Sequence, residues 1–264
     1  MFYSDKGKQM AEKNAEFFKI ELAGRKIEVD CLYRYVFNQC GTYLTRFAEP
    51  DFCVGASEAD IAFERHTQAA EALSSPESAL EDASDEYLES LAVCRQIAVH
   101  MLDYDTFLMH GAVIALDNQT SFMFTAKSGT GKTTHIRKWL ENAPGAFVVN
   151  GDKPLIKIAG EEAIAYGTPW CGKEHLNTNI GVPLRAIVLM ERSEDNAIEE
   201  ITFSQAFPTL LQQTYRPADA DKMRKTLSLL SALNGKMKFY RFRFNNLKPD
   251  AFRVSYEALT GKRL

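Results

Sequence analysis

The sequence predicts a mixed α/β core that follows a smaller α+β part. Three observations support this fold class. The first hundred residues hold short apolar runs, longer buried-type strands begin at Phe107, and a glycine-rich loop joins one of those strands to a helix. The 264 residues suffice for one large or two small domains. We expect an α+β part over residues 1–104 and a core over residues 105–264.

The α+β part is predicted from three strand-like runs and one helix. The runs are Phe17–Leu22, Ile27–Val29 and Phe52–Val54, and turn residues separate them. From about Asp85 to Leu102 the apolar residues recur at helical spacing, and Ser84 is a suitable N-cap. We expect this part to be a specificity or assembly element.

The core begins with two strands that pair as a hairpin. Phe107–Leu116 is a buried-type strand, and a turn connects it to Ser121–Thr125. The remaining expected strands are Phe147–Val149, Leu155–Ile158, Ala163–Tyr166, Leu184–Met190 and Lys236–Phe244, and the expected helices are Thr133–Asn142, Thr209–Gln213, Asp221–Asn234 and Pro249–Leu259. Because several strands follow one another without a helix between them, we expect a mixed sheet.

Composition excludes several classes of protein. Lys and Arg total 31 against 35 Asp and Glu, a net charge of −4, which argues against a protein that coats nucleic acid. No apolar run approaches the roughly 18 residues that span a bilayer, and the charged start is not a signal peptide. The five cysteines form no CxxC pair, so we expect a reducing, cytoplasmic setting.

Charge is unevenly distributed along the chain. Residues 58–90 carry ten acids and one strong base, whereas residues 216–264 carry twelve bases and four acids. Two solvated faces of opposite sign would explain this pattern. Alternatively, the basic C-terminal part helps to hold an anionic ligand.

The most informative motif is AKSGTGKTT at residues 126–134, which lies between a predicted strand and a predicted helix. This context is typical of a phosphate-binding P-loop, in which glycines let backbone N–H groups face phosphate oxygens. The helix N-terminus adds partial positive charge, Lys132 adds a full charge, and Thr133 can bind Mg²⁺. The expected ATP-binding residues are Lys127, Ser128, Gly129, Thr130, Gly131, Lys132, Thr133 and Thr134.

Ala126 stands where such a loop usually has its first glycine. A positive φ would strain an alanine at this position. We therefore expect Ala126 to adopt a conformation that alanine tolerates.

Asp152 is the carboxylate nearest to the end of the strand that follows the loop and its helix. It comes after Asn150 and Gly151 and precedes Lys153. Asp152 could bind Mg²⁺ together with Thr133, or act as a base toward a substrate hydroxyl. The alternative is a surface turn, because Asn-Gly-Asp is favourable turn chemistry.

The order of these motifs resembles a known group of kinases. His110-Gly111-Ala112-Val113, a hairpin, SGTGKTT and a strand ending at Asn-Gly-Asp are similar to the kinase domain of HPr kinase/phosphorylase and to the nucleotide core of ATP-dependent phosphoenolpyruvate carboxykinase. The resemblance covers about residues 107–264. It implies a mixed-sheet P-loop core with His110 and Asp152 at the transferred phosphoryl group. The acidic pair of the HPr kinase group is reduced here to Asp152.

A second distinctive stretch runs from Tyr166 to His175. Its glycines and proline shape a loop. We expect Trp170, Lys173 and Glu174 of this loop, together with Lys153 next to Asp152, to contact a substrate. The alternative is a tight turn with Trp170 in the core. Cys171 is interpreted as structural.

These observations predict an ATP- and Mg²⁺-dependent kinase. Lys132 and Mg²⁺ would spread the charge of the γ-phosphoryl group while Asp152, assisted by His110, takes the proton of a hydroxyl acceptor. The acceptor would be a protein or peptide serine or a small alcohol, and related kinases tend to form homo-oligomers. Two alternatives are a P-loop NTPase that drives a partner and a nucleotide sensor without catalysis.

Overall fold

The computed structural model describes residues 16–74, 83–127 and 129–264. Packing divides these residues into two compact units. One contains residues 16–20 and 26–94, and the other contains residues 21–25 and 95–264.

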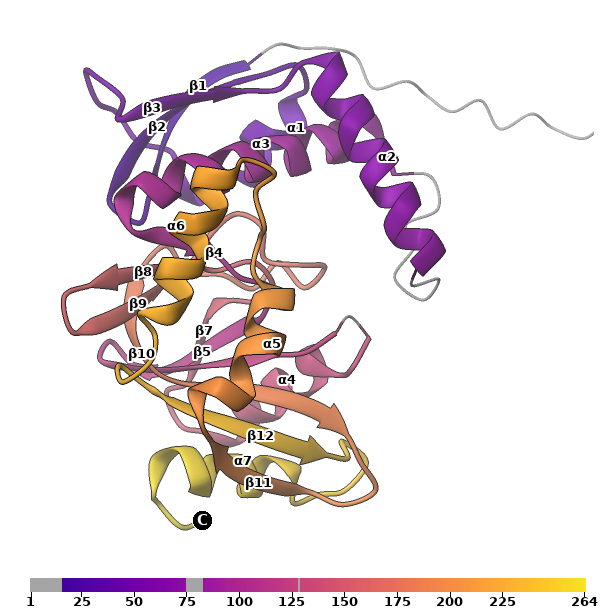
Figure 1. The fold of residues 1–264 in the computed structure, drawn as a ribbon, viewed down its shortest axis with the longest axis vertical. Helices are drawn as coiled ribbons and strands as arrows, with labels where there is room; N and C mark the ends of the chain where they lie inside the picture. Colours follow the sequence, from indigo (N-terminus) through magenta and orange to yellow (C-terminus); the bar gives the residue numbers. More distant parts are fainter. Residues whose placement is uncertain (1–15, 75–82, 128) are drawn as a thin grey trace, which may run out of the picture. The chain divides into compact units, whose positions relative to one another are not determined.

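The first unit is built on a three-stranded sheet (Figure 1). Its strands are β1 (Glu16–Leu22), β2 (Arg25–Cys31) and β3 (Phe52–Gly55), in that order, with β2 parallel to β3. Along β2, buried Ile27 and Val29 alternate with less buried neighbours, as expected of a sheet with one covered face. The three strands agree with the runs expected from the sequence.

Helices complete this unit. They are α1 (Arg34–Gln39), the short 3-10 helix η1 (Gly41–Tyr43), α2 (Glu58–Ser74) and the first part of α3 (Asp85–Met101). Glu89 of α3 is fully buried and accepts hydrogen bonds from the backbone N–H groups of Leu32 and Tyr33, just before α1. Burial raises the pKa of Glu89, although those two hydrogen bonds oppose the rise. Of these helices, the sequence predicted only α3.

The second unit contains a nine-stranded mixed sheet. Its strands are β4 (Thr106–Leu108), β5 (Ala112–Asp117), β6 (Thr120–Thr125), β7 (Phe147–Asn150), β8 (Leu155–Ala159), β9 (Glu162–Tyr166), β10 (Gly181–Arg192), β11 (Ala197–Ile201) and β12 (Lys238–Phe244). The order is β4-β8-β9-β10-β6-β5-β7, and β12 pairs with both β10 and β11. β10 runs parallel to β6 and β12, whereas β5 runs antiparallel to β6 and β7. The expectation of a mixed sheet is confirmed.

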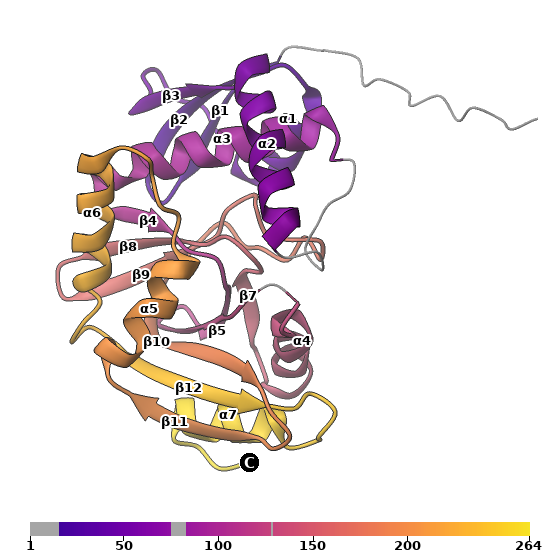
Figure 2. The ribbon, with the colours of Figure 1, turned by 45° about the vertical axis from the view of Figure 1, so that its right-hand side comes forward.

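Helices cover both faces of this sheet (Figure 2). The helices are α4 (Lys132–Asn142), α5 (Phe203–Gln213), α6 (Ala220–Ser231) and α7 (Ala251–Thr260), and the short η3 (Leu102–Tyr104) follows α3. α5 and α6 share one hydrophobic core with Ile187 of β10, whereas α4 and α7 share the other with Val188. Successive side chains of β10 thus point to opposite faces of the sheet. Because helices cover both faces, the middle of β10 is apolar throughout.

Two expectations about individual elements were wrong. The strand expected over Phe107–Leu116 is interrupted between β4 and β5, where Gly111 passes so close to β6 that a Cβ would lie 2.4 Å from Met123 Cε. The helix expected at Thr209 begins at Phe203 because Thr202 forms a capping box with Gln205. The interruption matters for function, because it holds His110.

Candidate functional site

The strand directions bring five connecting segments to one edge of the sheet in the second unit. Since β5 is antiparallel to β6 and β7, its first residues lie between the last residues of those two strands. β10 and β12 are parallel to β6, so they end at the same edge. We call the residues that follow β6, β7, β10 and β12, together with those that precede β5, the site edge.

The loop between β6 and α4 has the backbone conformation that its glycines permit. Gly129 and Gly131 have φ values of 74° and 115°, in the left-handed region that favours glycine. Ala126 is buried and is not among the described residues with positive φ, as expected. Ser128 lies outside the described residues. Strand, loop and helix follow in the order that a P-loop requires.

Lys132 is the first residue of α4 and is nearly buried, with 9% of its surface exposed. Its Nζ donates to the carbonyl oxygens of Ala126 at 3.0 Å and Lys127 at 3.5 Å, so the side chain turns back into the loop. Burial lowers its pKa to about 8; the charge of Asp152 opposes this shift, and that of Lys153 adds to it. The ammonium group therefore lies within the loop and within electrostatic reach of Asp152.

The first turn of α4 presents two threonine hydroxyl groups next to the loop. Thr133 and Thr134 are exposed, and among the described residues the Thr133 hydroxyl makes no hydrogen bond. A free hydroxyl at this place can bind Mg²⁺, which usually takes only one or two protein ligands beside waters and phosphate oxygens. Within the described ranges, no group of three or more His, Cys, Asp and Glu side chains could hold a metal ion.

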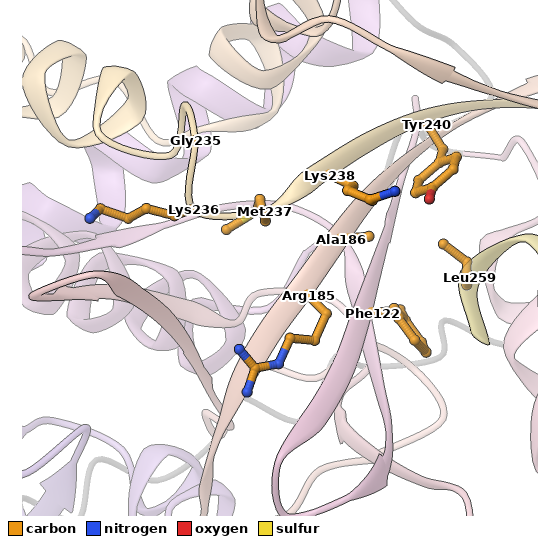
Figure 3. Close-up of a pocket in the computed structure, with 9 residues that line it drawn as sticks. All are labelled: Phe122, Arg185, Ala186, Gly235, Lys236, Met237, Lys238, Tyr240 and Leu259. Carbon is orange, nitrogen blue, oxygen red and sulfur yellow. The ribbon is translucent and has the colours of Figure 1, made fainter. Parts of the chain in front are cut away.

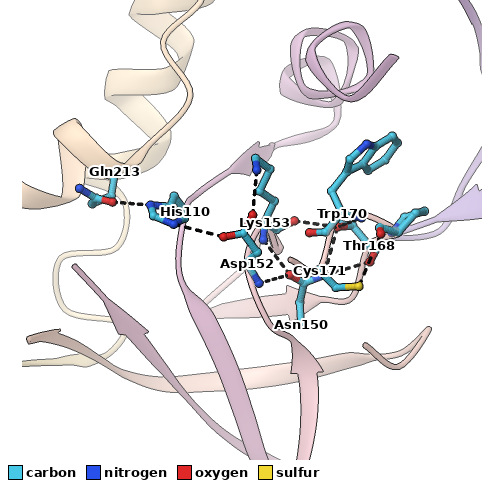
Figure 4. Close-up of polar contacts among 9 residues, drawn as sticks. His110, Asn150, Asp152, Lys153, Thr168, Trp170, Cys171 and Gln213 are labelled. Carbon is cyan, nitrogen blue, oxygen red and sulfur yellow. Dashed lines mark hydrogen bonds and ion pairs between the residues drawn. The ribbon is translucent and has the colours of Figure 1, made fainter. Parts of the chain in front are cut away.

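Asp152 is held between two cationic or hydrogen-donating side chains (Figure 4). Its Oδ1 lies 3.2 Å from His110 Nε2 and its Oδ2 lies 2.8 Å from Lys153 Nζ. Burial by itself raises the pKa of Asp152, but the hydrogen bond with His110 and the charge of Lys153 outweigh burial and hold that pKa well below its usual range. Asp152 is therefore a carboxylate at neutral pH, and both of its oxygens have partners.

Asn150, a residue the sequence indicated only as part of a turn, fixes the backbone around Asp152. Its buried Oδ1 accepts hydrogen bonds from the N–H groups of Asp152 at 2.9 Å and Lys153 at 2.7 Å. Its Nδ2 donates to the backbone oxygen of Thr168 at 3.0 Å and to the Thr168 hydroxyl at 3.1 Å. The amide is thus fully used, and it ties the Asp152 turn to the loop after β9.

Gln213, at the end of α5, is a second residue that sequence reasoning missed. Its Oε1 lies 2.8 Å from His110 Nδ1, and its backbone oxygen accepts the His110 N–H at 2.7 Å. A flip of the Gln213 side-chain amide exchanges its oxygen for its NH₂ group. Gln213 can therefore accept a hydrogen bond from a protonated Nδ1 or donate one to an unprotonated Nδ1. In both cases Nε2 carries the proton that faces the Asp152 carboxylate.

The loop after β9 places the expected substrate residues in different surroundings. Trp170 is buried, and its backbone oxygen accepts the Lys153 N–H at 3.1 Å. Glu174 is ion-paired with Arg137 of α4 at 2.6 Å, and Lys173 is exposed. That these residues, with Lys153, contact a substrate stays a prediction.

Cys171 is buried in the same loop. Asn177 Nδ2 donates to its sulfur at 3.0 Å, and burial raises the pKa of the thiol. A raised pKa disfavours the reactive thiolate, which agrees with a structural role for Cys171.

A cavity of about 430 Å³ lies toward the opposite end of the strands (Figure 3). Phe122, Ala186 and Lys238 line it, and the strand register places the three side by side on β6, β10 and β12. Its basic side chains already have acidic partners, such as Lys238 with Glu200 at 2.9 Å. This cavity is separate from the site edge.

Comparisons with known proteins find similarity among solved structures. No family model matches the chain, and no curated protein matches it. A solved structure of the Hpr(Ser) kinase/phosphatase from Coxiella burnetii is similar over 57% of this chain and 95% of its own, with a TM-score of 0.35 and 10% identity. None of the described helices is long and apolar enough to cross a membrane.

Proposed function

We propose that this protein is an ATP- and Mg²⁺-dependent phosphotransferase that acts on a hydroxyl group. One observation carries the proposal: His110 lies between the end of β6, which leads into the P-loop, and Asp152, which follows β7. The His110 backbone oxygen accepts the Thr125 hydroxyl at 2.7 Å, and its Nε2 is 3.2 Å from Asp152 Oδ1. A phosphate-binding loop and a charged carboxylate on one edge are what phosphoryl transfer needs.

Each residue has a specific task in this reaction. The amides of the loop and the first turn of α4 bind the phosphates, and the Lys132 ammonium neutralises charge on their oxygens. Thr133 is the expected Mg²⁺ ligand, and the metal, when bound, would offset the charge that develops on the transferred group. Asp152 orients the acceptor hydroxyl and takes its proton as the new O–P bond forms and the bond to ADP breaks.

The low pKa of Asp152 is compatible with this role. A carboxylate bound by His110 and Lys153 is a weak base, but catalysis of phosphoryl transfer depends mainly on positioning and electrostatic stabilisation. Positioning of the hydroxyl then contributes more than basicity. His110 Nε2 already donates its proton to Oδ1, so His110 orients the carboxylate while the proton of the acceptor goes to Asp152 itself.

The proposal is tested by incubating the full chain with γ-³²P-ATP and Mg²⁺, with pooled metabolites in one reaction and lysate proteins in another. Label should move to a metabolite or to a protein, and the Asp152→Asn variant should bind nucleotide but transfer no label. Glu161→Gln, an exposed change in the turn after β8, is the matched control and should keep full transfer.

Two other outcomes would replace the proposal. Release of free phosphate alone would favour an NTPase that drives a partner. Nucleotide binding without any chemistry would favour a sensor.

A further inference from the structure

Three backbone carbonyl groups of the P-loop accept hydrogen bonds from side chains outside the loop. The donors lie at the end of β10 and in the loop after β12. Arg192, the last residue of β10, donates from Nη2 to the oxygen of Gly129 and from Nε to that of Thr130 at 3.3 Å. Asn246, in the loop after β12, donates from Nδ2 to the oxygen of Gly131 at 3.2 Å. Three successive carbonyls are thus fixed.

Fixing a carbonyl also fixes the N–H of the next residue. Across a trans peptide the C=O of one residue and the N–H of the next point in opposite directions. With the oxygens of Gly129 and Thr130 held by Arg192, the N–H groups of Thr130 and Gly131 face away from it. The Thr130 N–H accordingly points toward the Lys127 oxygen at 3.4 Å, the same oxygen that Lys132 Nζ approaches.

The charge of Arg192 is not neutralised locally. In the described part of the chain Arg192 makes no ion pair with a carboxylate, whereas Arg185, seven positions earlier on β10, pairs with Glu162 at 3.0 Å. A guanidinium without a carboxylate partner favours an anion near this loop, where the Gly131 N–H makes no hydrogen bond within the described residues. The two-pronged donor geometry of Arg192 suits two neighbouring carbonyls better than a single ammonium would.

We propose that Arg192 is a positioning residue for the nucleotide phosphates. It holds the P-loop with the N–H group of Gly131 turned toward the phosphates before the nucleotide binds, and Asn246 extends this support to the oxygen of Gly131. This inference rests on the proposed function, because it takes the ligand to be a nucleoside phosphate. A loop fixed in advance loses less conformational entropy when the nucleotide binds.

The test is the affinity of the full chain for a fluorescent ADP derivative (mant-ADP) in the presence of Mg²⁺. Arg192→Gln should raise the Kd about tenfold, in line with the loss of hydrogen bonds from a charged donor. Arg192→Lys keeps the charge but not the two-pronged geometry, so its Kd should rise almost as much. Arg185→Gln, on the same strand, is the matched control and should leave the Kd unchanged.

A second readout separates positioning from general stability. In the protein without nucleotide, Arg192→Gln should shift the amide ¹H and ¹⁵N resonances of Gly131 but not those of Gly160, in the remote turn after β8. An unchanged Gly131 amide, or full affinity in Arg192→Gln or Arg192→Lys, would overturn the inference alone. A wild-type chain that binds no mant-ADP would overturn the proposed function and this role with it.

Discussion

His110 Nε2 lies 3.2 Å from Asp152 Oδ1, although the two residues belong to different strand connections separated by 42 positions. The Gly111 N–H also donates to the Asp152 backbone oxygen at 2.8 Å, so main chain and side chains both hold the pair together. The contact exists because β5 lies between β6 and β7 and runs against both. The order and direction of the strands therefore bring His110 and Asp152 together. Several measurements can test the roles of these residues and their neighbours.

Asp152 should stabilise the fold in a pH-dependent way. The pKa of Asp152 in the folded protein is lowered below its ordinary value of 3.8, so its contribution is present above that pH and is lost as the pH falls further. At pH 7 Asp152→Asn should lower the free energy of unfolding by about 1–3 kcal/mol. Urea titrations of both proteins from pH 7 to pH 2.5 should show the difference shrink below pH 4. A difference that stays constant down to pH 2.5 would contradict the lowered pKa.

Nucleotide affinity should fall at alkaline pH through Lys132. Because burial lowers the pKa of Lys132 to about 8, the ammonium is lost as the pH rises through 8, while a bound phosphate favours its protonated form. The Kd for ADP should therefore increase about tenfold per pH unit above 8, and binding at pH 8.5 should take up protons. Calorimetry in two buffers of different ionisation enthalpy measures this uptake. Lys132→Arg, which stays charged, should abolish it.

Gln213 should affect transfer more than nucleotide binding. Gln213→Leu removes the partner of His110 Nδ1, so the imidazole is free to turn and Asp152 loses its orientation. We expect the rate of transfer to fall about 10- to 100-fold with an unchanged Kd for ADP. Gln213→Glu retains an acceptor at Nδ1 and should recover part of the rate. Gln212→Leu, at an exposed neighbouring position, is the control. Equal loss in both leucine variants would argue against the role of Gln213.

Asn150 should be important for stability. Asn150→Ala leaves the N–H groups of Asp152 and Lys153 and the oxygen of Thr168 without their buried partner. The expected loss is about 2–4 kcal/mol in the free energy of unfolding. Asn142→Ala removes a comparable amide hydrogen bond at an exposed helix end and should cost less than about 1 kcal/mol. Thermal or urea unfolding measures the free energy of unfolding of the two variants. Equal losses in both would contradict the importance of Asn150.

Much of the local structure, including the glycine-rich loop between β6 and α4, could be predicted from the sequence. The strand before the loop, its glycines and the helix after it carry local signals, and these signals do not depend on the rest of the chain. The strands β6, β8 and β9 accordingly lie within one residue of their expected bounds.

Residues that reach the site edge through strand order could not be predicted. Arg192 is one arginine in a charged strand end, and Gln213 lies 103 positions from His110. Nothing local distinguishes them, because their roles arise from the parallel pairing of β10 with β6 and from the way the chain after α5 returns beside His110. The interruption between β4 and β5 was missed because it is short and apolar residues flank His110 and Gly111 on both sides.

The most direct test of the account is a calorimetric titration of ADP with Mg²⁺ into the full chain, its Lys132→Ala variant and its Asp152→Asn variant. We predict saturable binding of one ADP by the wild-type chain, loss of binding in Lys132→Ala, and retained binding in Asp152→Asn. A wild-type chain that binds no ADP, or a Lys132→Ala variant that binds as well as the wild type, would contradict the claim that the site edge holds a nucleotide.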